Sequence, residues 1–285
     1  MPRWPVDLRS ANAANSGVPT AQGHVVMDVA YRCCPEVDVA GMVGDVKRAI
    51  AWMKAHAAEF GVRPERVVLA GASAGGHVAL LAAYAPNHAR LTAEELRGAD
   101  TSVLAVVSYY GVPDLRAYGE HTTARLADVP AKPPASNERR EPGRLATSLN
   151  RLLMGRTLTA EQSPPSPPHR QMMRDMVGGL PDEVPEMYDL VSPIHHGGAT
   201  SPPTLLFHGE HDSIVPVASV RRLYHALVAA RVPTVYVEFP RTEHAFDLLY
   251  PPLLGPAGQA ALYDLHRFLA CVASHSFPSK RLASK

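Results

Sequence analysis

Cysteine, long apolar runs and net charge are all scarce in this sequence, and each absence argues against a class of protein. Only 3 of the 285 residues are cysteine, too few for a disulfide framework. Adjacent Cys33 and Cys34 cannot easily bridge each other, so we interpret the thiols as free in a reducing compartment. Apolar runs such as residues 103–107 are far too short to span a bilayer. A net charge of +1 leaves no basic stripe for nucleic acid.

Apolar residues, by contrast, are abundant: 46% of the chain is hydrophobic and 19% is charged. A chain of this composition buries a large core and does not stay disordered. Its length fits one large domain over residues 1–285. The opening Met-Pro-Arg-Trp-Pro lacks the apolar stretch of a signal peptide. We therefore predict a soluble, cytoplasmic protein with no membrane or nucleic-acid partner.

Two kinds of apolar pattern alternate along the chain. Strand-like runs are followed by segments whose apolar residues recur at helical spacing, which is typical of βαβ units. We predict strands at 24–30, 66–70, 103–109, 203–208 and 233–239, and helices at 41–60 (ending at Gly61), 76–85, 217–230 and 257–272, with a short helix after a capping box at 92–95. The alternation predicts an α/β fold: a mainly parallel sheet with helices on both faces.

Residues 111–188 interrupt this alternation. They are rich in proline, and nothing across 111–200 has the pattern of a core strand. Helical patches are predicted around 143–156 and 169–178. Because long insertions of this kind often cover a binding site, we predict a Pro-rich cap or lid inserted into the single domain.

A glycine-rich turn follows the predicted strand at 66–70. It has the pattern G-x-S-x-G from Gly71 to Gly75 and precedes a helix-forming run. On a sharp strand-to-helix turn Ser73 would project its hydroxyl away from the sheet, and the two glycines would omit Cβ atoms that clash across the turn. The helix N-terminus would direct amide N–H groups at developing negative charge. Ser73 is therefore the predicted nucleophile.

A serine hydroxyl needs a base to become a nucleophile, and candidates follow the last two predicted strands. Asp212 comes shortly after 203–208, and His244 comes shortly after 233–239. The carboxyl ends of parallel strands meet at one edge of an open sheet, where active sites assemble. The chain order Ser, Asp, His is also that of enzymes with a nucleophile elbow. We predict Asp212 as the acid and His244 as the base.

Several neighbouring residues are weaker candidates. Glu210 and Glu243 flank the proposed acid and base, and either is an alternative carboxylate. We interpret His208, at the end of a predicted strand, as a packing residue. His211 also flanks the acid, and His77 is interpreted as a structural residue of the helix after the serine.

No metal or cofactor site is predicted. The pair His195 and His196 resembles a metal site only superficially, because no cysteine or carboxylate accompanies it at ligand spacing. The sequence also contains no P-loop and no dinucleotide-binding fingerprint. We therefore expect chemistry carried by side chains alone, acting on a small molecule.

Short motifs along the chain point to a family. They are 31–32 (Tyr-Arg), 35–36 (Pro-Glu), 45–46 (Asp-Val), 61–67 (GVRPERV), 71–77 (GASAGGH), 192–194 (SPI), 208–212 (HGEHD) and 243–246 (EHAF). With these the chain resembles the α/β-hydrolase family, in its hormone-sensitive-lipase-like and feruloyl- and carbohydrate-esterase-like branch. The resemblance covers 24–110 and 189–272 well and 111–188 poorly. It implies a carboxylic ester hydrolase with nucleophile Ser73, acid Asp212 and base His244, and with the Ala74 N–H as one oxyanion donor.

One motif of that branch is missing. Its oxyanion-hole sequence, His-Gly-Gly-Gly, would stand on the strand before 24–30, and residues 1–23 contain neither the motif nor an apolar run to replace that strand. The resemblance thus implies an α/β-hydrolase fold that is N-terminally truncated. A second oxyanion donor, and any signal or membrane anchor, would be lost with the missing segment. Whether Met1 is the true start is left open, and so is the activity of the chain as it stands.

The expected function is a serine esterase that forms an acyl-enzyme and acts on short-acyl or aryl esters. One alternative is a non-catalytic or inactive protein on a hydrolase scaffold, which the missing oxyanion segment favours. The other is a serine exopeptidase of the prolyl-oligopeptidase type, which shares the triad order but usually carries an aromatic residue where this chain has Ala74. The oligomeric state is not predicted.

Overall fold

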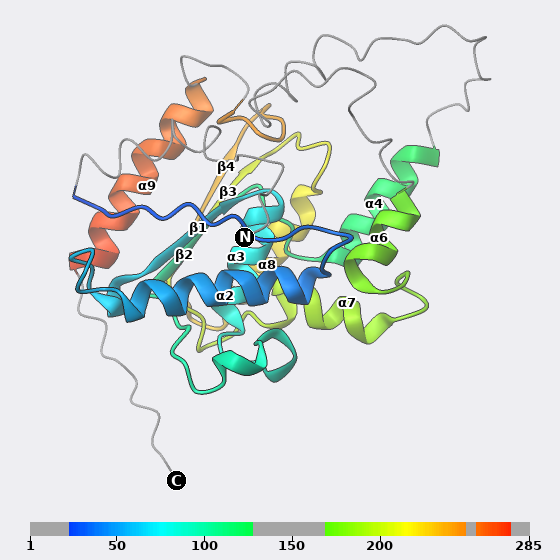
Figure 1. The fold of residues 1–285 in the computed structure, drawn as a ribbon. Coiled ribbons are helices and arrows are strands. Elements are labelled where there is room, and N and C mark those ends of the chain that lie inside the picture. The colour runs from blue at the N-terminus through cyan, green and yellow to red at the C-terminus, as the bar shows by residue number, and fades with distance from the viewer. Residues whose placement is uncertain (1–22, 128–168, 249–254, 275–285) are drawn as a thin grey trace, which may run out of the picture.

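The core of the molecule is a parallel sheet of four strands (Figure 1). The computed structural model describes residues 23–127, 169–248 and 255–274. The strands are β1 (Val68–Ala72), β2 (Ala105–Tyr109), β3 (Thr204–Gly209) and β4 (Thr234–Phe239), in the order β1-β2-β3-β4. Their register pairs Ala72 with Tyr109, Tyr109 with Phe207 and Phe207 with Val237. All four carboxyl ends therefore meet at the same edge of the sheet.

Helices connect the strands. The first begins after Asp38, whose side chain caps it by accepting a 2.8 Å hydrogen bond from the Gly41 N–H. The α-helices are α2 (Val39–Ala55), α3 (Ala74–Tyr84), α4 (Leu115–Ala127), α6 (His169–Val177), α7 (Pro185–Val191), α8 (Val217–Ala229) and α9 (Pro256–Ser274). Short 3-10 helices are η1 (Pro64–Arg66), η2 (Ala89–Leu91), η3 (Glu94–Leu96) and η4 (Pro193–His195).

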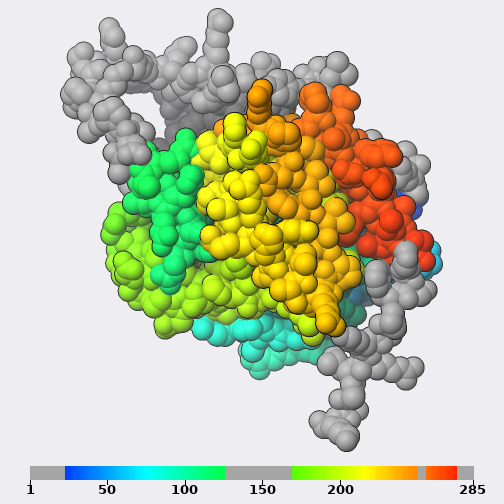
Figure 2. All heavy atoms as spheres, turned by 180° about the vertical axis from the view of Figure 1, so that it is seen from behind, coloured from blue at the N-terminus to red at the C-terminus, as the bar shows by residue number. Residues whose placement is uncertain are grey.

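The two faces of the sheet are covered by different helices, because successive strand residues point to opposite faces. Val106 and Leu206 pack on one face against α3 and α8, while Val107 and Phe207 pack on the other face against α9. Helix α2 lies outside α3 and forms a further layer. Seen from behind, α8 occupies the middle of the molecule, with α4 on one side and α9 on the other (Figure 2). The predicted parallel sheet with helices on both faces is confirmed.

Residues 24–30 form no strand, so that prediction is wrong. The segment contributes Val29 to the core, but Val25 and Val26 are 49% and 44% exposed. It is held instead by Arg32, whose backbone N–H and guanidinium bond Asp45 on α2 at 2.8–3.0 Å. An apolar run predicts an extended chain but not a neighbour to pair with, and no described residue pairs with this segment.

Two helix predictions also need correction. Helix α2 ends at Ala55 rather than near residue 60, and Gly61, with φ of +64°, belongs to the turns that follow. The capping box at 92–95 does not form, because the Thr92 hydroxyl accepts a 2.8 Å hydrogen bond from Lys47 and faces the Pro86 carbonyl. Only the single 3-10 turn η3 follows it.

The described part of residues 111–188 is helical. Helices α4, α6 and α7 contact one another and bury Met173 and Tyr188 in the core shared with α2 and α3. The predicted helix at 169–178 is confirmed as α6, whereas 143–156 lies outside the described residues. Within the described residues, no helix is both long and apolar enough to cross a membrane.

Candidate active site

Ser73 occupies the tight turn between β1 and α3. Its backbone has φ of 53° and ψ of −119°, a conformation that costs free energy for any residue with a side chain. Two backbone hydrogen bonds hold it there: the Ser73 N–H donates to the Tyr109 carbonyl at 2.9 Å, and the Ser73 carbonyl accepts from His77 at 3.0 Å. The turn thus raises the Ser73 side chain above the edge of the sheet.

Two glycines near Ser73 allow close contacts that a side chain would prevent. Only one of them belongs to the predicted pair, Gly71 and Gly75. A Cβ on Gly71 would lie 2.3 Å from the Gly75 carbonyl oxygen. A Cβ on Gly76 would lie 2.8 Å from the Ser108 hydroxyl. At Gly75 the nearest atom would be the Tyr31 hydroxyl at 3.9 Å, which is ordinary contact, so the predicted reason for Gly75 is wrong. The second obligatory glycine is Gly76.

Ser73, His244 and Asp212 lie in one chain of hydrogen bonds. The Ser73 hydroxyl donates to Nε2 of His244 at 3.0 Å, and Nδ1–H of His244 donates to Oδ2 of Asp212 at 2.8 Å. His244 and Asp212 are only 9% and 7% exposed. The three residues follow β1, β4 and β3, so they converge at the carboxyl edge of the sheet.

Asp212 is held as a carboxylate by its surroundings. Its Oδ1 accepts hydrogen bonds from the backbone N–H groups of Ile214 and Val215 at 2.9 and 2.8 Å. Burial by itself would raise the pKa of Asp212, but the hydrogen bond and charge of His244 and the Val215 N–H hold it below the ordinary value. An ionised Asp212 fixes the proton of His244 on Nδ1 and leaves Nε2 free to accept from Ser73.

The alternative carboxylates bond backbone groups rather than the His244 ring. Oε1 of Glu243 accepts from the N–H groups of Ser213 and His244 at 2.5 and 3.0 Å. These two bonds hold the pKa of Glu243 below its ordinary value, although partial burial acts in the opposite direction. Oε2 of Glu210 accepts from the Arg241 N–H at 3.0 Å. Both glutamates therefore tie loops together.

The loops after β3 and β4 form a cross-linked unit, which we call the acid–base corner (residues 209–215 and 239–247). The Glu210 N–H donates to the Phe239 carbonyl at 2.9 Å, and the His211 N–H donates to the Thr242 carbonyl at 3.0 Å. A Cβ on Gly209 would lie 2.3 Å from that same Thr242 oxygen. The close backbone approach sets the separation of the two loops and hence of Asp212 from His244.

The sequence analysis missed Tyr110. Its ring lies 4.5 Å from the His244 ring, centroid to centroid, and its hydroxyl donates to Asp247. Tyr110 is 1% exposed, and its φ of 38° turns the chain directly after β2. Burial above all, followed by the charge of Asp247, raises its pKa, so it stays protonated. The available signal was an aromatic residue at the carboxyl end of a predicted central strand.

Three other histidines, His77, His195 and His196, have contacts that suit structural parts. Nδ1 of His77 bonds the Val112 carbonyl at 2.7 Å, and burial lowers the pKa of His77 to about 4. His196 bonds the Leu190 carbonyl at 2.7 Å, while His195 lies 3.4 Å from Asp189. Among the residues that the structure describes, no group of three or more His, Cys, Asp or Glu side chains could hold a metal ion.

The residue expected to supply an oxyanion donor, Ala74, directly follows Ser73. Ala74 is the first residue of α3, where a backbone N–H has no acceptor within its own helix. The helix dipole adds to the attraction for negative charge at that end. A second donor would have to come from another part of the chain, and residues 1–22 lie outside the described residues.

Comparison with known proteins places this geometry in a wider group. A family model described as BD-FAE matches residues 9–150 and 152–227. The probable carboxylic ester hydrolase LipM of Mycobacterium tuberculosis is 33% identical over 228 residues, covering 80% of this chain and 43% of the relative. Esterase LipC of the same organism is 32% identical over 251 residues, covering 87% and 52%. The chain thus spans about half the length of these curated relatives.

Solved structures of Thermogutta terrifontis esterase 2 are similar to this chain. The form phosphoramylated by tabun is 25% identical with a TM-score of 0.56, covering 87% of this chain and 71% of the esterase. The butyrate-bound form is also 25% identical with a TM-score of 0.54, covering 83% and 67%. The likeness covers most of this chain and supports the expected fold.

Proposed function

The chain belongs to the BD-FAE family of hormone-sensitive-lipase-like esterases, and on this premise we propose that it hydrolyses carboxylic esters through an acyl-enzyme. The α/β-hydrolase fold expected for that family is confirmed by the parallel sheet and by the esterase structures. Ser73 is the proposed nucleophile, His244 the general base and Asp212 the acid that orients the base.

The first half-reaction is acylation. Nε2 of His244 takes the proton of the Ser73 hydroxyl while Oγ bonds the ester carbonyl carbon, which leaves a tetrahedral oxyanion. The N–H of Ala74 donates to that oxyanion. The intermediate collapses when the carbon–oxygen bond to the alcohol breaks and the His244 imidazolium protonates the departing oxygen. The alcohol leaves, and the acyl group stays on Ser73.

Deacylation repeats these steps with water. His244 takes a proton from water, the resulting hydroxide bonds the acyl carbon, and the bond to Ser73 Oγ breaks as that oxygen regains its proton from His244. The carboxylic acid is released. Asp212 stays ionised throughout and stabilises each imidazolium, a role supported by its short bond to Nδ1 and its lowered pKa.

The observation that carries the proposal is the unbroken chain of hydrogen bonds from Ser73 through His244 to Asp212. It joins three segments that lie far apart in the sequence and ends on a strained serine at a helix N-terminus. A structural turn would need neither the buried base nor the buried acid.

We propose short-acyl or aryl esters as substrates. The butyrate bound to a similar esterase supports the short-acyl class. We also propose that residues 111–188 form a cap over the site. The support is a contact between α4 and the acid–base corner, where Nε2 of His121 bonds the Ser213 carbonyl at 3.2 Å. A cap in this position would limit the length of the acyl chain.

The test is hydrolysis of p-nitrophenyl acetate and butyrate by the chain 1–285, compared with Ser73→Ala and with Ser102→Ala as a control at an exposed serine remote from the site. We expect Ser73→Ala to lose activity by about 10⁴- to 10⁶-fold, and the control to keep it. Equal rates from folded wild type and Ser73→Ala would overturn the proposal and leave the inactive hydrolase-fold protein. Faster turnover of a dipeptide p-nitroanilide than of either ester would favour the exopeptidase.

A further inference from the structure

The carboxylate of Asp212 faces two histidines, not one. Its Oδ2 accepts from Nδ1 of His244 at 2.8 Å and also lies 3.2 Å from Nε2 of His208. His208 is near the end of β3, four residues before Asp212 in the chain. The side chains of both residues are fully enclosed, at 0% exposure. Asp212 is therefore held by His208 from β3 as well as by His244.

The contacts of His208 determine which ring nitrogen carries its proton. Nε2 lies 3.1 Å from the carbonyl oxygen of Val215 and 3.2 Å from Oδ2 of Asp212. Both partners only accept hydrogen bonds, so Nε2 must be the protonated nitrogen. Burial lowers the pKa of His208 more than the charge of Asp212 raises it, which keeps the ring neutral. A neutral His208 offers these two acceptors a single shared N–H.

We propose that His208 is a positioning residue that holds the Asp212 carboxylate in line with His244 and draws off part of its negative charge. This inference rests on the proposed function. The geometry is a closed ring: Nε2–H of His208 reaches the Val215 carbonyl, and the Val215 N–H donates to Oδ1 of Asp212 at 2.8 Å. Rotation of the carboxylate would break this ring as well as the bond to His244.

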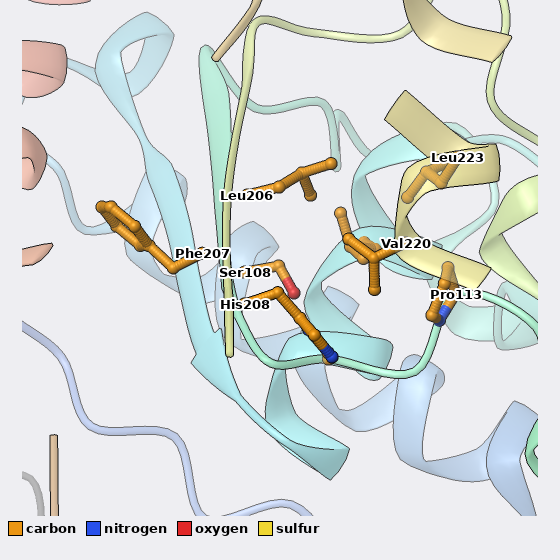
Figure 3. A pocket seen from close by; sticks show the side chains of 9 residues that line it. Ser108, Pro113, Leu206, Phe207, His208, Val220 and Leu223 are labelled. Atoms are coloured by element: carbon orange, nitrogen blue, oxygen red, sulfur yellow. The ribbon is translucent and has the colours of Figure 1, made fainter. Parts of the chain in front are cut away.

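The other side of the ring argues against packing as the sole use of His208. Nδ1 is buried and has no hydrogen-bond partner among the described residues. His208 lines a narrow gap between the sheet and helices α3 and α8, together with Ser108 and Val220 (Figure 3). A buried lone pair without a donor costs free energy, whereas a leucine would fill the same space without that cost. The Nε2 bonds supply what a leucine lacks.

The other charged groups that face this pair constrain the test. Glu238 on β4 acts on His208 by its charge, but it is itself paired with Arg221. Glu243 and Asp212 act on each other by their charges, and Tyr110, which donates to Asp247, packs against the His244 ring. None of these groups changes when His208 alone is replaced. A change in the pH profile of such a variant therefore reports the lost N–H.

The experiment compares His208→Leu, which removes the N–H, with His208→Gln, whose amide nitrogen reaches the same position. Without the N–H of His208, the Asp212 carboxylate keeps more of its negative charge. It then stabilises the imidazolium form of the triad histidine more strongly than in wild type. The acid limb of the plot of kcat/KM against pH therefore moves to higher pH. We expect a shift of about 0.5 to 1 pH unit for His208→Leu, with kcat reduced about tenfold and KM little changed. His208→Gln should stay within about threefold of wild type.

Val220→Ala is the matched control, because it enlarges the same gap without removing a donor to the acid. An acid limb that stays in place in His208→Leu, or that moves equally in Val220→Ala, would overturn the proposal. ¹⁵N NMR of the unmodified protein tests the tautomer without any variant: protonated Nε2 supports the proposal, and protonated Nδ1 overturns it. NMR can also follow the protonation of the triad histidine in wild type and His208→Leu without turnover, and the same upward shift in pH is expected there. Failure of ester hydrolysis in wild type would thus count against the proposed function and not against this contact.

Discussion

Two parts of the molecule border the turn at Ser73, and they are held in different ways. The acid–base corner is cross-linked by backbone bonds, by both glutamates and by the contact of Gly209 with Thr242. The segment 24–32 has no ladder to any described strand, and its main polar anchor is the contact of Arg32 with Asp45 on α2. The geometry of the acid–base corner is therefore fixed by contacts within the corner, whereas the position of the segment 24–32 is fixed by its contact with helix α2.

Because of this difference, we expect damage to the two regions to have different consequences. The positions of Asp212 and His244 depend on contacts within residues 204–247, so damage there should appear in catalysis first. The segment 24–32 approaches the Ser73 turn through Tyr31, whose hydroxyl lies 3.9 Å from the position that a Cβ on Gly75 would take. Damage there should appear in local opening first, because few backbone hydrogen bonds resist it.

The largest expected effect is the loss of the acid. Asp212→Asn keeps the shape of the side chain but removes the charge that holds the proton on Nδ1 of His244, so kcat should fall by about 10⁴-fold. Glu243→Gln keeps an oxygen that can accept from the same N–H groups and should lose less than about tenfold. Steady-state kinetics on p-nitrophenyl butyrate measures both. A larger loss in Glu243→Gln than in Asp212→Asn would make Glu243 the acid.

The next effect tests the close approach inside the corner. Gly209→Ala would place a methyl group 2.3 Å from the Thr242 carbonyl oxygen, which accepts a 3.0 Å hydrogen bond from the His211 N–H of the facing loop. The loops must separate, and we expect the free energy of unfolding to fall by about 3 kcal/mol, with reduced kcat/KM. Gly198→Ala meets nothing within 4 Å and should change stability by less than about 0.5 kcal/mol. Urea unfolding that fails to distinguish the two variants would refute the tight corner.

A smaller effect tests the attachment of the segment 24–32. Asp45→Ala removes the acceptor of all three Arg32 hydrogen bonds. Asp45 also pairs with Arg48 on its own helix, but the Arg32 bonds are the ones that reach the segment, so we expect the change to loosen mainly residues 24–32. Hydrogen exchange should quicken about fivefold or more in residues 24–32 and stay unchanged in β2 and β3. Asp100→Ala, which removes an exposed partner of Lys54, is the control. Equal exchange in both variants would mean that apolar packing alone holds the segment.

The comparison also shows how far the sequence could be interpreted. The strands at 66–70, 103–109, 203–208 and 233–239 were predicted to within two residues of each bound, because buried parallel strands have continuous apolar runs. Asp212 and His244 could be chosen because they directly follow such strands. The run 24–30 has the same local pattern, yet pairing depends on a neighbour that no local pattern reveals.

Other features depended on contacts between distant residues. Gly76 is needed because the Ser108 hydroxyl lies where its Cβ would be. The capping box does not form because the Thr92 hydroxyl accepts a hydrogen bond from Lys47 instead. Likewise, Asp212 and Glu243 are both carboxylates at the correct edge of the sheet. Both accept hydrogen bonds from backbone N–H groups, and only the further bond of Asp212 to the His244 ring distinguishes the two.

The smallest expected effect concerns the helix that anchors the segment 24–32. Lys47 on α2 is fully buried, and its ammonium group donates to the Ala85 carbonyl at the end of α3 at 2.6 Å and to Thr92 at 2.8 Å. Burial lowers the pKa of Lys47 to about 8. From that pH up to the ordinary lysine value of about 10.4, the folded chain binds fewer protons than the unfolded chain, so this group makes stability rise with pH.

Lys47→Met removes both the charge and its pH dependence. At pH 7 we expect little net change, because losing two hydrogen bonds is offset by no longer burying an ammonium group. As pH rises from 8 to 10, the free energy of unfolding of wild type should increase relative to that of the variant by less than about 1.4 kcal/mol per pH unit. Urea unfolding at four pH values measures the gap. Parallel stability curves would mean that Lys47 keeps its proton in the folded chain, stabilised by the carbonyl end of α3, the helix that begins at Ser73.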